Sequence, residues 1–191
     1  MRYVKMKQRP NLIQLAKEVY KANKAKGFHD APVSNNTLLM LVITELSEAI
    51  EADRKGKRAD LQKYRELILN TITPSPLAFT TLFELYIKDT VEDELADTVI
   101  RVLDLAGYRN ISTLTTSVLA WYQKGFYDSF CENIYYLIKA FIKSHDLGII
   151  APEVIRGVED LCKQMNIDIW YHVALKLEYN KTRPQRHGKA Y

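Results

Sequence analysis

The chain has 191 residues, of which 47% are hydrophobic and 26% charged, and its formal net charge is +4. This composition is typical of a globular protein, and the length suffices for one domain, residues 1–191, with a core that needs no disulfides. No apolar run approaches the ~18 residues that span a bilayer, and no signal peptide follows the basic N-terminus. These features exclude a membrane-spanning or exported protein, so we expect a cytoplasmic one.

Apolar residues recur every three to four positions along most of the chain, and no stretch alternates apolar and polar residues. This period predicts an all-α fold. In chain order we expect helices over residues 11–26, 35–55, 59–70, 79–87, 90–106, 112–124, 126–145, 152–165 and 168–180. The last residues, 181–191, form an expected basic tail that suits an anionic partner such as nucleotide phosphates or nucleic acid.

Residues with strong local preferences mark the expected helix ends. Asn35 or Asn36 is the expected N-cap of the second helix, because its side chain can accept from a free backbone N–H. Gly107 marks the end of the helix over residues 90–106. Pro152 fits the first turn of a helix, where a missing backbone N–H has no cost.

Two of these helices each carry a pair of acids three residues apart: Glu45 with Glu48, and Glu94 with Asp97. Residues three apart lie on one helix face, and each pair is embedded in apolar sequence. If the two helices pack antiparallel, four carboxylates converge, where repulsion and desolvation oppose their ionised forms. A hard divalent cation resolves this conflict, and Mg²⁺ prefers carboxylate oxygens together with substrate phosphates.

Other readings of these acids remain open at this point. Either pair alone is equally typical of a solvated helix face with lysine or arginine nearby. A ferritin-like di-iron bundle requires Glu-x-x-His on two helices, and none of the four histidines has a glutamate three positions before it. The residues therefore favour an oxygen-only site for Mg²⁺, with Mn²⁺ as a substitute. Asp104 lies two turns after Asp97 and is a further candidate for this site.

The order of these motifs resembles that of the MazG-like nucleotide pyrophosphohydrolases, whose relatives include dimeric dUTPases and HisE-type phosphoribosyl-ATP pyrophosphohydrolases. The resemblance extends to three longer strings: LVITELSEAIEADRKGK (41–57), KDTVEDELADTVIRVLDLAG (88–107) and KLEYNKTRPQRHGKAY (176–191). It implies a MazG-like helical bundle with extra helices. The interval between the two acid pairs is longer than in compact members, and we interpret the segment around residues 61–87, with its Thr-Pro-Ser-Pro run, as an insertion.

Carried over by position, the resemblance implies that Mg²⁺ is held by Glu45, Glu48, Glu94 and Asp97. It also implies substrate contacts near the metal or the phosphates at Asp104, Lys176, Tyr179, Asn180 and Arg183. The implied reaction is magnesium-dependent cleavage of a nucleoside triphosphate, ribo or deoxy, to the monophosphate and pyrophosphate. Glu45 or Glu48 is the expected catalytic carboxylate that accepts the proton of the attacking water.

The alternative function is a non-catalytic nucleotide-binding or regulatory module of the same fold. A nucleic-acid-binding protein is less favoured, because no helix-turn-helix, zinc-finger or RNA-binding signature occurs. Members of the family assemble as dimers or tetramers, so the resemblance also implies a homo-oligomer.

Overall fold

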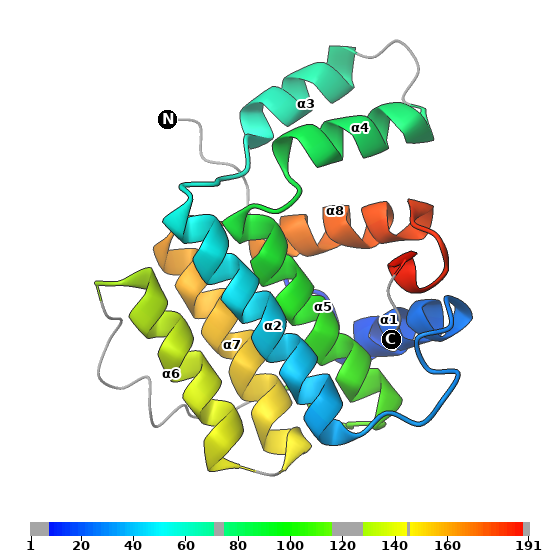
Figure 1. The fold of residues 1–191 in the computed structure, drawn as a ribbon, viewed down its shortest axis with the longest axis vertical. Helices are drawn as coiled ribbons and strands as arrows, with labels where there is room; N and C mark the ends of the chain where they lie inside the picture. The colour runs from blue at the N-terminus through cyan, green and yellow to red at the C-terminus, as the bar shows by residue number, and fades with distance from the viewer. Residues whose placement is uncertain (1–7, 71–74, 116–127, 145, 189–191) are drawn as a thin grey trace.

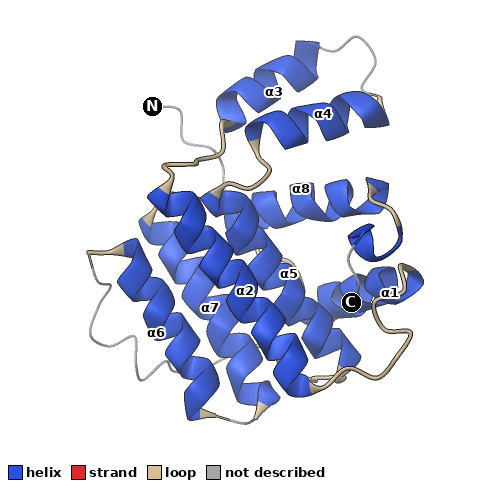
Figure 2. Cartoon of the chain, in the orientation of Figure 1, coloured by secondary structure: helices blue, strands red, loops and turns tan. Residues whose placement is uncertain are grey.

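The computed structural model describes residues 8–70, 75–115, 128–144 and 146–188. Within these ranges all regular structure is helical, which confirms the all-α prediction (Figure 2). The elements are α1 (Leu12–Ala25), α2 (Asn35–Arg54), α3 (Leu61–Asn70), α4 (Pro76–Tyr86), α5 (Val91–Tyr108), α6 (Phe130–Lys143), α7 (Leu147–Gln164), α8 (Ile169–Thr182) and the 3₁₀ helix η2 (Gln185–Gly188).

Helix α5 lies at the centre of the fold. It contacts α1, α2, α7 and α8, and 15 of its 18 residues are buried. Figure 1 shows α2 and α5 side by side and running in opposite directions, with α6 and α7 next to them. The main hydrophobic core forms where these helices meet, and a helix buried on nearly every side is expected at such a position. Side chains on α2 and α5 can therefore face each other.

A second, smaller core joins α3 and α4 to α8. Phe83 on α4 stacks on Tyr179 of α8 with ring centroids 4.4 Å apart, and Tyr64 and Ile87 complete the cluster. Helices α3 and α4 pack against each other and project together from the rest of the described structure, at the top of Figure 1. The segment around residues 61–87 is thus a helical hairpin, and its origin as an insertion stays a prediction.

Two expected helix ends differ from the observed ones. Ser34, rather than Asn35 or Asn36, caps α2, because its side chain accepts from the backbone N–H of Thr37 at 3.1 Å. Gly107 lies inside α5 and not after it. A Cβ atom at Gly107 would overlap the carbonyl oxygen of Ala16, so this glycine allows α1 to pack closely against α5.

Two further predictions were wrong over described residues. Helix α7 begins at Leu147, five residues before Pro152, because Asp146 caps it by accepting from the N–H of Gly148 at 2.7 Å. Pro152 therefore lies within the helix. Residues 111–115 are not helical, and the remainder of the helix expected over 112–124 lies outside the described residues.

The residues at the end of α8 and just after it pack on the loop that follows α1. Lys26 donates through Nζ to the carbonyl oxygens of Lys181 and Arg183, and the N–H of Arg186 donates to the carbonyl of Lys26 at 2.9 Å. Thr182 still belongs to α8, so the described part of the expected tail includes the end of α8 and η2. None of the helices that the structure describes is both long and apolar enough to cross a bilayer.

The burial of His172 leads us to predict that folding stability depends on pH. Its side chain is buried in α8, and burial, with a smaller contribution from the charge of Arg65, lowers its pKa to about 4. The unfolded chain binds a proton at this histidine below about pH 6.5, whereas the folded chain does so only below about pH 4. Folding stability from this group is therefore present above pH 6.5 and declines by about 3 kcal/mol between pH 6.5 and pH 4.

Urea unfolding of the wild type and of His172→Gln between pH 4 and pH 7 measures this effect. We expect the difference in unfolding free energy between the two proteins to shrink as the pH falls. Parallel pH profiles would show that His172 titrates normally in the folded state.

Candidate metal centre

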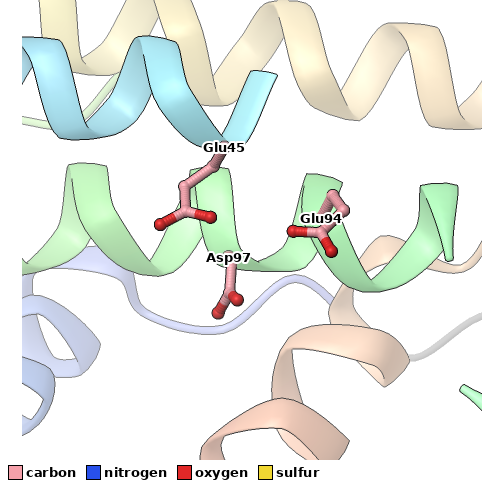
Figure 3. Close-up of side chains that lie close together, drawn as sticks. All are labelled: Glu45, Glu94 and Asp97. Atoms are coloured by element: carbon pink, nitrogen blue, oxygen red, sulfur yellow. The ribbon is translucent and has the colours of Figure 1, made fainter. Parts of the chain in front are cut away.

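Three of the four predicted metal ligands converge between α2 and α5. Glu45 of α2 and Glu94 and Asp97 of α5 each present a carboxylate oxygen, and these three oxygens lie within 4.8 Å of one another. Figure 3 shows Glu45 extending from α2 toward α5, where Glu94 and Asp97 lie close to it. Glu45 and Glu94 are buried, and Asp97 is partly buried. The three-residue spacing within α5 puts Glu94 and Asp97 on one face, as the sequence predicts.

Two of these carboxylates have a cationic partner. Nε of Arg101 donates to Glu45 at 2.9 Å, and Nζ of Lys176 lies 2.8 Å from Asp97. Lys176 also donates to Asp93 at 2.7 Å, and both the lysine and this aspartate are almost fully buried. The side-chain carboxyl group of Glu94 has no hydrogen bond or ion pair to any described residue. In its ionised form, Glu94 would therefore add a negative charge with no cationic partner among the described residues.

The pKa values reflect this imbalance. Burial, the negative charges of Asp93 and Asp97, and a smaller contribution from Glu48 raise the pKa of Glu94 to about 9. Burial and the charge of Asp97 also raise the pKa of Glu45, although Arg101 opposes them. Burial disfavours the charged form of Lys176, but Asp97 and Asp93 outweigh it, and the lysine pKa is raised. A further positive charge would favour the ionised form of Glu94.

The donor set fits a hard divalent cation. All three converging ligand atoms are carboxylate oxygens, which Mg²⁺ and Mn²⁺ prefer and softer metals do not. The carboxyl group of the buried Glu94, which has no hydrogen-bond or ion-pair partner among the described residues, is the group that such an ion would satisfy. Glu45, Glu94 and Asp97 are therefore the residues that can hold it.

Glu48 lies outside this cluster. Its side chain is exposed on α2, although its charge contributes to the raised pKa values of Glu45 and Glu94. Asp104 also lies apart: it is buried, and both of its carboxylate oxygens are 3.0 Å from Nε2 of His29.

The predicted substrate contacts on α8 and at its C-cap have different environments from one another. Tyr179 is part of the second core, and its hydroxyl donates to Glu84 at 2.8 Å. Asn180 lines a pocket of about 210 Å³ between α1 and α8. Arg183 is the C-cap of α8, with its guanidinium 5.9 Å from the ring centroid of Tyr179. Of the predicted set on α8, Lys176 alone contacts the acid cluster directly, through Asp97.

A pocket of about 500 Å³ adjoins the cluster at Arg101, which lines the pocket and bonds Glu45. The loop after α1 and the beginning of α2 supply its apolar side chains, which include Phe28, Val33 and Leu38. His29 and Asp104 line it as a hydrogen-bonded pair, and Arg186 of η2 joins them. The volume is within the range of small-molecule sites.

The site contains residues that the sequence reasoning missed. Asp93 precedes Asp97 by four positions and Arg101 follows it by four, so both lie on the helix face of Asp97. That spacing was a usable signal for both residues. His29 has no such signal, because its partner Asp104 is 75 positions away.

No family model, curated protein or solved structure matches this chain. The resemblance to MazG-like proteins therefore stays a prediction from sequence motifs.

Lys176 generates a prediction about stability. In Lys176→Met, the buried carboxylate of Asp93 and the partly buried one of Asp97 lose their ammonium partner, so we expect the unfolding free energy to fall by about 3–5 kcal/mol. Urea unfolding with and without Mg²⁺ measures it. Magnesium should restore part of the loss, because a cation bound beside Asp97 compensates the same charge.

The matched control is Lys181→Met on the same helix, since Lys181 has an exposed ion pair with Glu178. This change should leave the stability nearly unaltered. Equal stability of the two variants would contradict the role of Lys176.

Glu94 generates a prediction about protons. With a pKa of about 9, its carboxyl group is protonated at pH 7.5, whereas a cation requires the carboxylate. Binding of Mg²⁺ or Mn²⁺ should therefore release a proton, and the apparent affinity should rise with pH until about pH 9. Calorimetric titration in two buffers of different ionisation enthalpy counts the protons. Identical heats in both buffers would show that Glu94 is already ionised.

Proposed function

We propose that this chain is a magnesium-dependent nucleoside triphosphate pyrophosphohydrolase, which cleaves a ribo- or deoxyribonucleotide to the monophosphate and pyrophosphate. The observation that carries the proposal is the convergence of Glu45, Glu94 and Asp97, among which the carboxyl group of Glu94 has no partner in the described part of the chain. An ion with oxygen ligands and open positions is the form in which proteins usually hold Mg²⁺ for phosphate chemistry. The motif order that resembles MazG-like enzymes supports the same reaction.

The neighbouring pocket supports a nucleotide as the substrate. It combines apolar side chains such as Phe28 and Leu38 with a few polar groups, a combination suited to a planar base with polar edges. Arg101 lies between the pocket and the acid cluster, because it lines the former and bonds Glu45 of the latter. A nucleoside in the pocket would thus have its phosphates toward the carboxylates.

Different residues of the site would have different roles in this reaction. A bound magnesium ion supplies charge neutralisation and polarises the phosphate oxygens. Arg101 holds Glu45, and Lys176 holds Asp97, so both carboxylates are oriented before substrate arrives. Glu45, whose pKa is raised, is the internal candidate for accepting the water proton, and the exposed Glu48 is the alternative on the same helix. We assign Lys176 to positioning Asp97 and not to direct phosphate contact.

A non-catalytic nucleotide-binding module is the second candidate. The exposure of Glu48 favours it, since only three of the four expected ligands converge. A binding module would take up nucleotide in the presence of Mg²⁺ and release no product. We further propose a homo-oligomer, dimer or tetramer, on the resemblance alone.

The test is incubation of the purified protein with a panel of ribo- and deoxyribonucleoside triphosphates, with and without Mg²⁺. We expect magnesium-dependent formation of pyrophosphate with a matching amount of monophosphate, quantified separately from orthophosphate. Glu94→Gln and Asp97→Asn should each lower turnover by at least about 100-fold, because a ligand is lost while the fold is kept. Glu48→Gln should also lower it, since its charge already acts on Glu45 and Glu94.

Glu66→Gln on α3 is the control for loss of one exposed negative charge and should retain full activity. Circular dichroism verifies that each variant remains helical. Full activity of Glu48→Gln would remove Glu48 from the site. Orthophosphate as the sole product would indicate a different phosphohydrolase, and nucleotide binding without any product would favour the binding module.

A further inference from the structure

We propose that the centre holds a second divalent cation at Asp89, Asp93 and Glu94, and that Glu94 bridges the two ions. Each of these residues offers a carboxylate oxygen, and the three oxygens lie within 4.8 Å of one another. Glu94 is common to this group and to the group with Glu45 and Asp97. The inference rests on the proposed function only through that shared carboxylate.

An unpartnered buried oxygen atom of Asp93 indicates that a ligand is missing from this second group. The side chain of Asp93 is 1% exposed, and its Oδ2 accepts from Lys176 and from the backbone N–H of Asp89. Its Oδ1 is buried and has no hydrogen-bond partner in the described part of the chain. The carboxylate of Glu94 likewise lacks a hydrogen bond or ion pair to described residues. Oδ1 of the Asp93 carboxylate is an acceptor, so its missing partner is a donor or a cation.

The local backbone brings the exposed member of the group to this point. Asp89 has a positive φ of 58° just before the beginning of α5, and its N–H donates to Oδ2 of Asp93 at 3.1 Å. The side chain of Asp89 is 56% exposed, so the second site is open to solvent on one side. A site with two buried carboxylates, one exposed carboxylate and access to water suits Mg²⁺ or Mn²⁺, which retain several waters in proteins.

Two lysines neighbour the second site and do not fill it. Lys176 contacts Oδ2 of Asp93, which leaves Oδ1 available. Lys88 pairs with Asp89 at 3.0 Å, but this ion pair lies at the surface, where such pairs contribute little. A divalent cation can displace Lys88 at small cost, and it adds the bonds that Asp93 and Glu94 lack.

The test titrates the full chain with Mn²⁺ alone, without nucleotide, and counts bound ions by electron paramagnetic resonance. We expect two Mn²⁺ per chain, with magnetic coupling between them because they share the Glu94 carboxylate. Asp89→Asn should bind one Mn²⁺ with an uncoupled six-line spectrum. Asparagine tolerates the positive φ at this position, so the loss is not a folding effect. Glu66→Gln is the charge-matched control and should still bind two.

The outcomes separate this inference from the proposed function. One Mn²⁺ in the wild type that Glu45→Gln removes would overturn the second site and leave the first intact. Two Mn²⁺ in Asp89→Asn would remove Asp89 from the ligands and overturn the site as assigned. Two uncoupled ions in the wild type would overturn the bridging role of Glu94. Absence of any bound Mn²⁺ would overturn both metal proposals.

Discussion

The burial of acids on the central helix is the constraint that organises this structure. Helix α5 is enclosed on almost every side, yet five of its residues carry carboxylates: Glu92, Asp93, Glu94, Asp97 and Asp104. Desolvation makes an unpaired buried carboxylate costly, so each needs a donor or a cation. The partners come from other elements. Ala59 donates to Glu92, Lys176 of α8 pairs with Asp93 and Asp97, and His29 bonds Asp104.

These polar contacts also place the elements around α5. The apolar stripes of α1, α2, α7 and α8 supply the force for packing, but a hydrophobic surface tolerates several rotations and translations of a helix. A buried lysine that pairs with two aspartates, or a histidine that bonds to a buried one, permits far fewer arrangements of the helices. Glu94 differs from these acids, because no described residue donates a hydrogen bond to its carboxyl group or forms an ion pair with it. A structure that pairs most of its buried acids and leaves acceptor oxygens of Asp93 and Glu94 without a described partner, at a convergence of carboxylates, has the form of a binding site.

Much of the architecture could be predicted from local signals. The helical period indicated most elements to within a few residues. The errors share a physical origin in competing interactions. The cap at Asp146 allows α7 to begin before Pro152. Gly107 does not end a helix, because it allows α1 to approach α5 closely. Residues on one face of α5 could likewise be predicted from their spacing. The hydrogen bond between His29 and Asp104 could not, because it joins distant parts of the chain.

The sequence by itself determined the fold class and the two acid pairs, because helix periodicity and three-residue spacing are local properties of the chain. Only the tertiary structure decided which acids meet. It brought Glu45 to Glu94 and Asp97, left Glu48 exposed, and used Lys176 as an internal partner for Asp93 and Asp97. The reason is that burial and charge compensation depend on the rotation of each helix against its neighbours, and contacts between distant residues set that rotation.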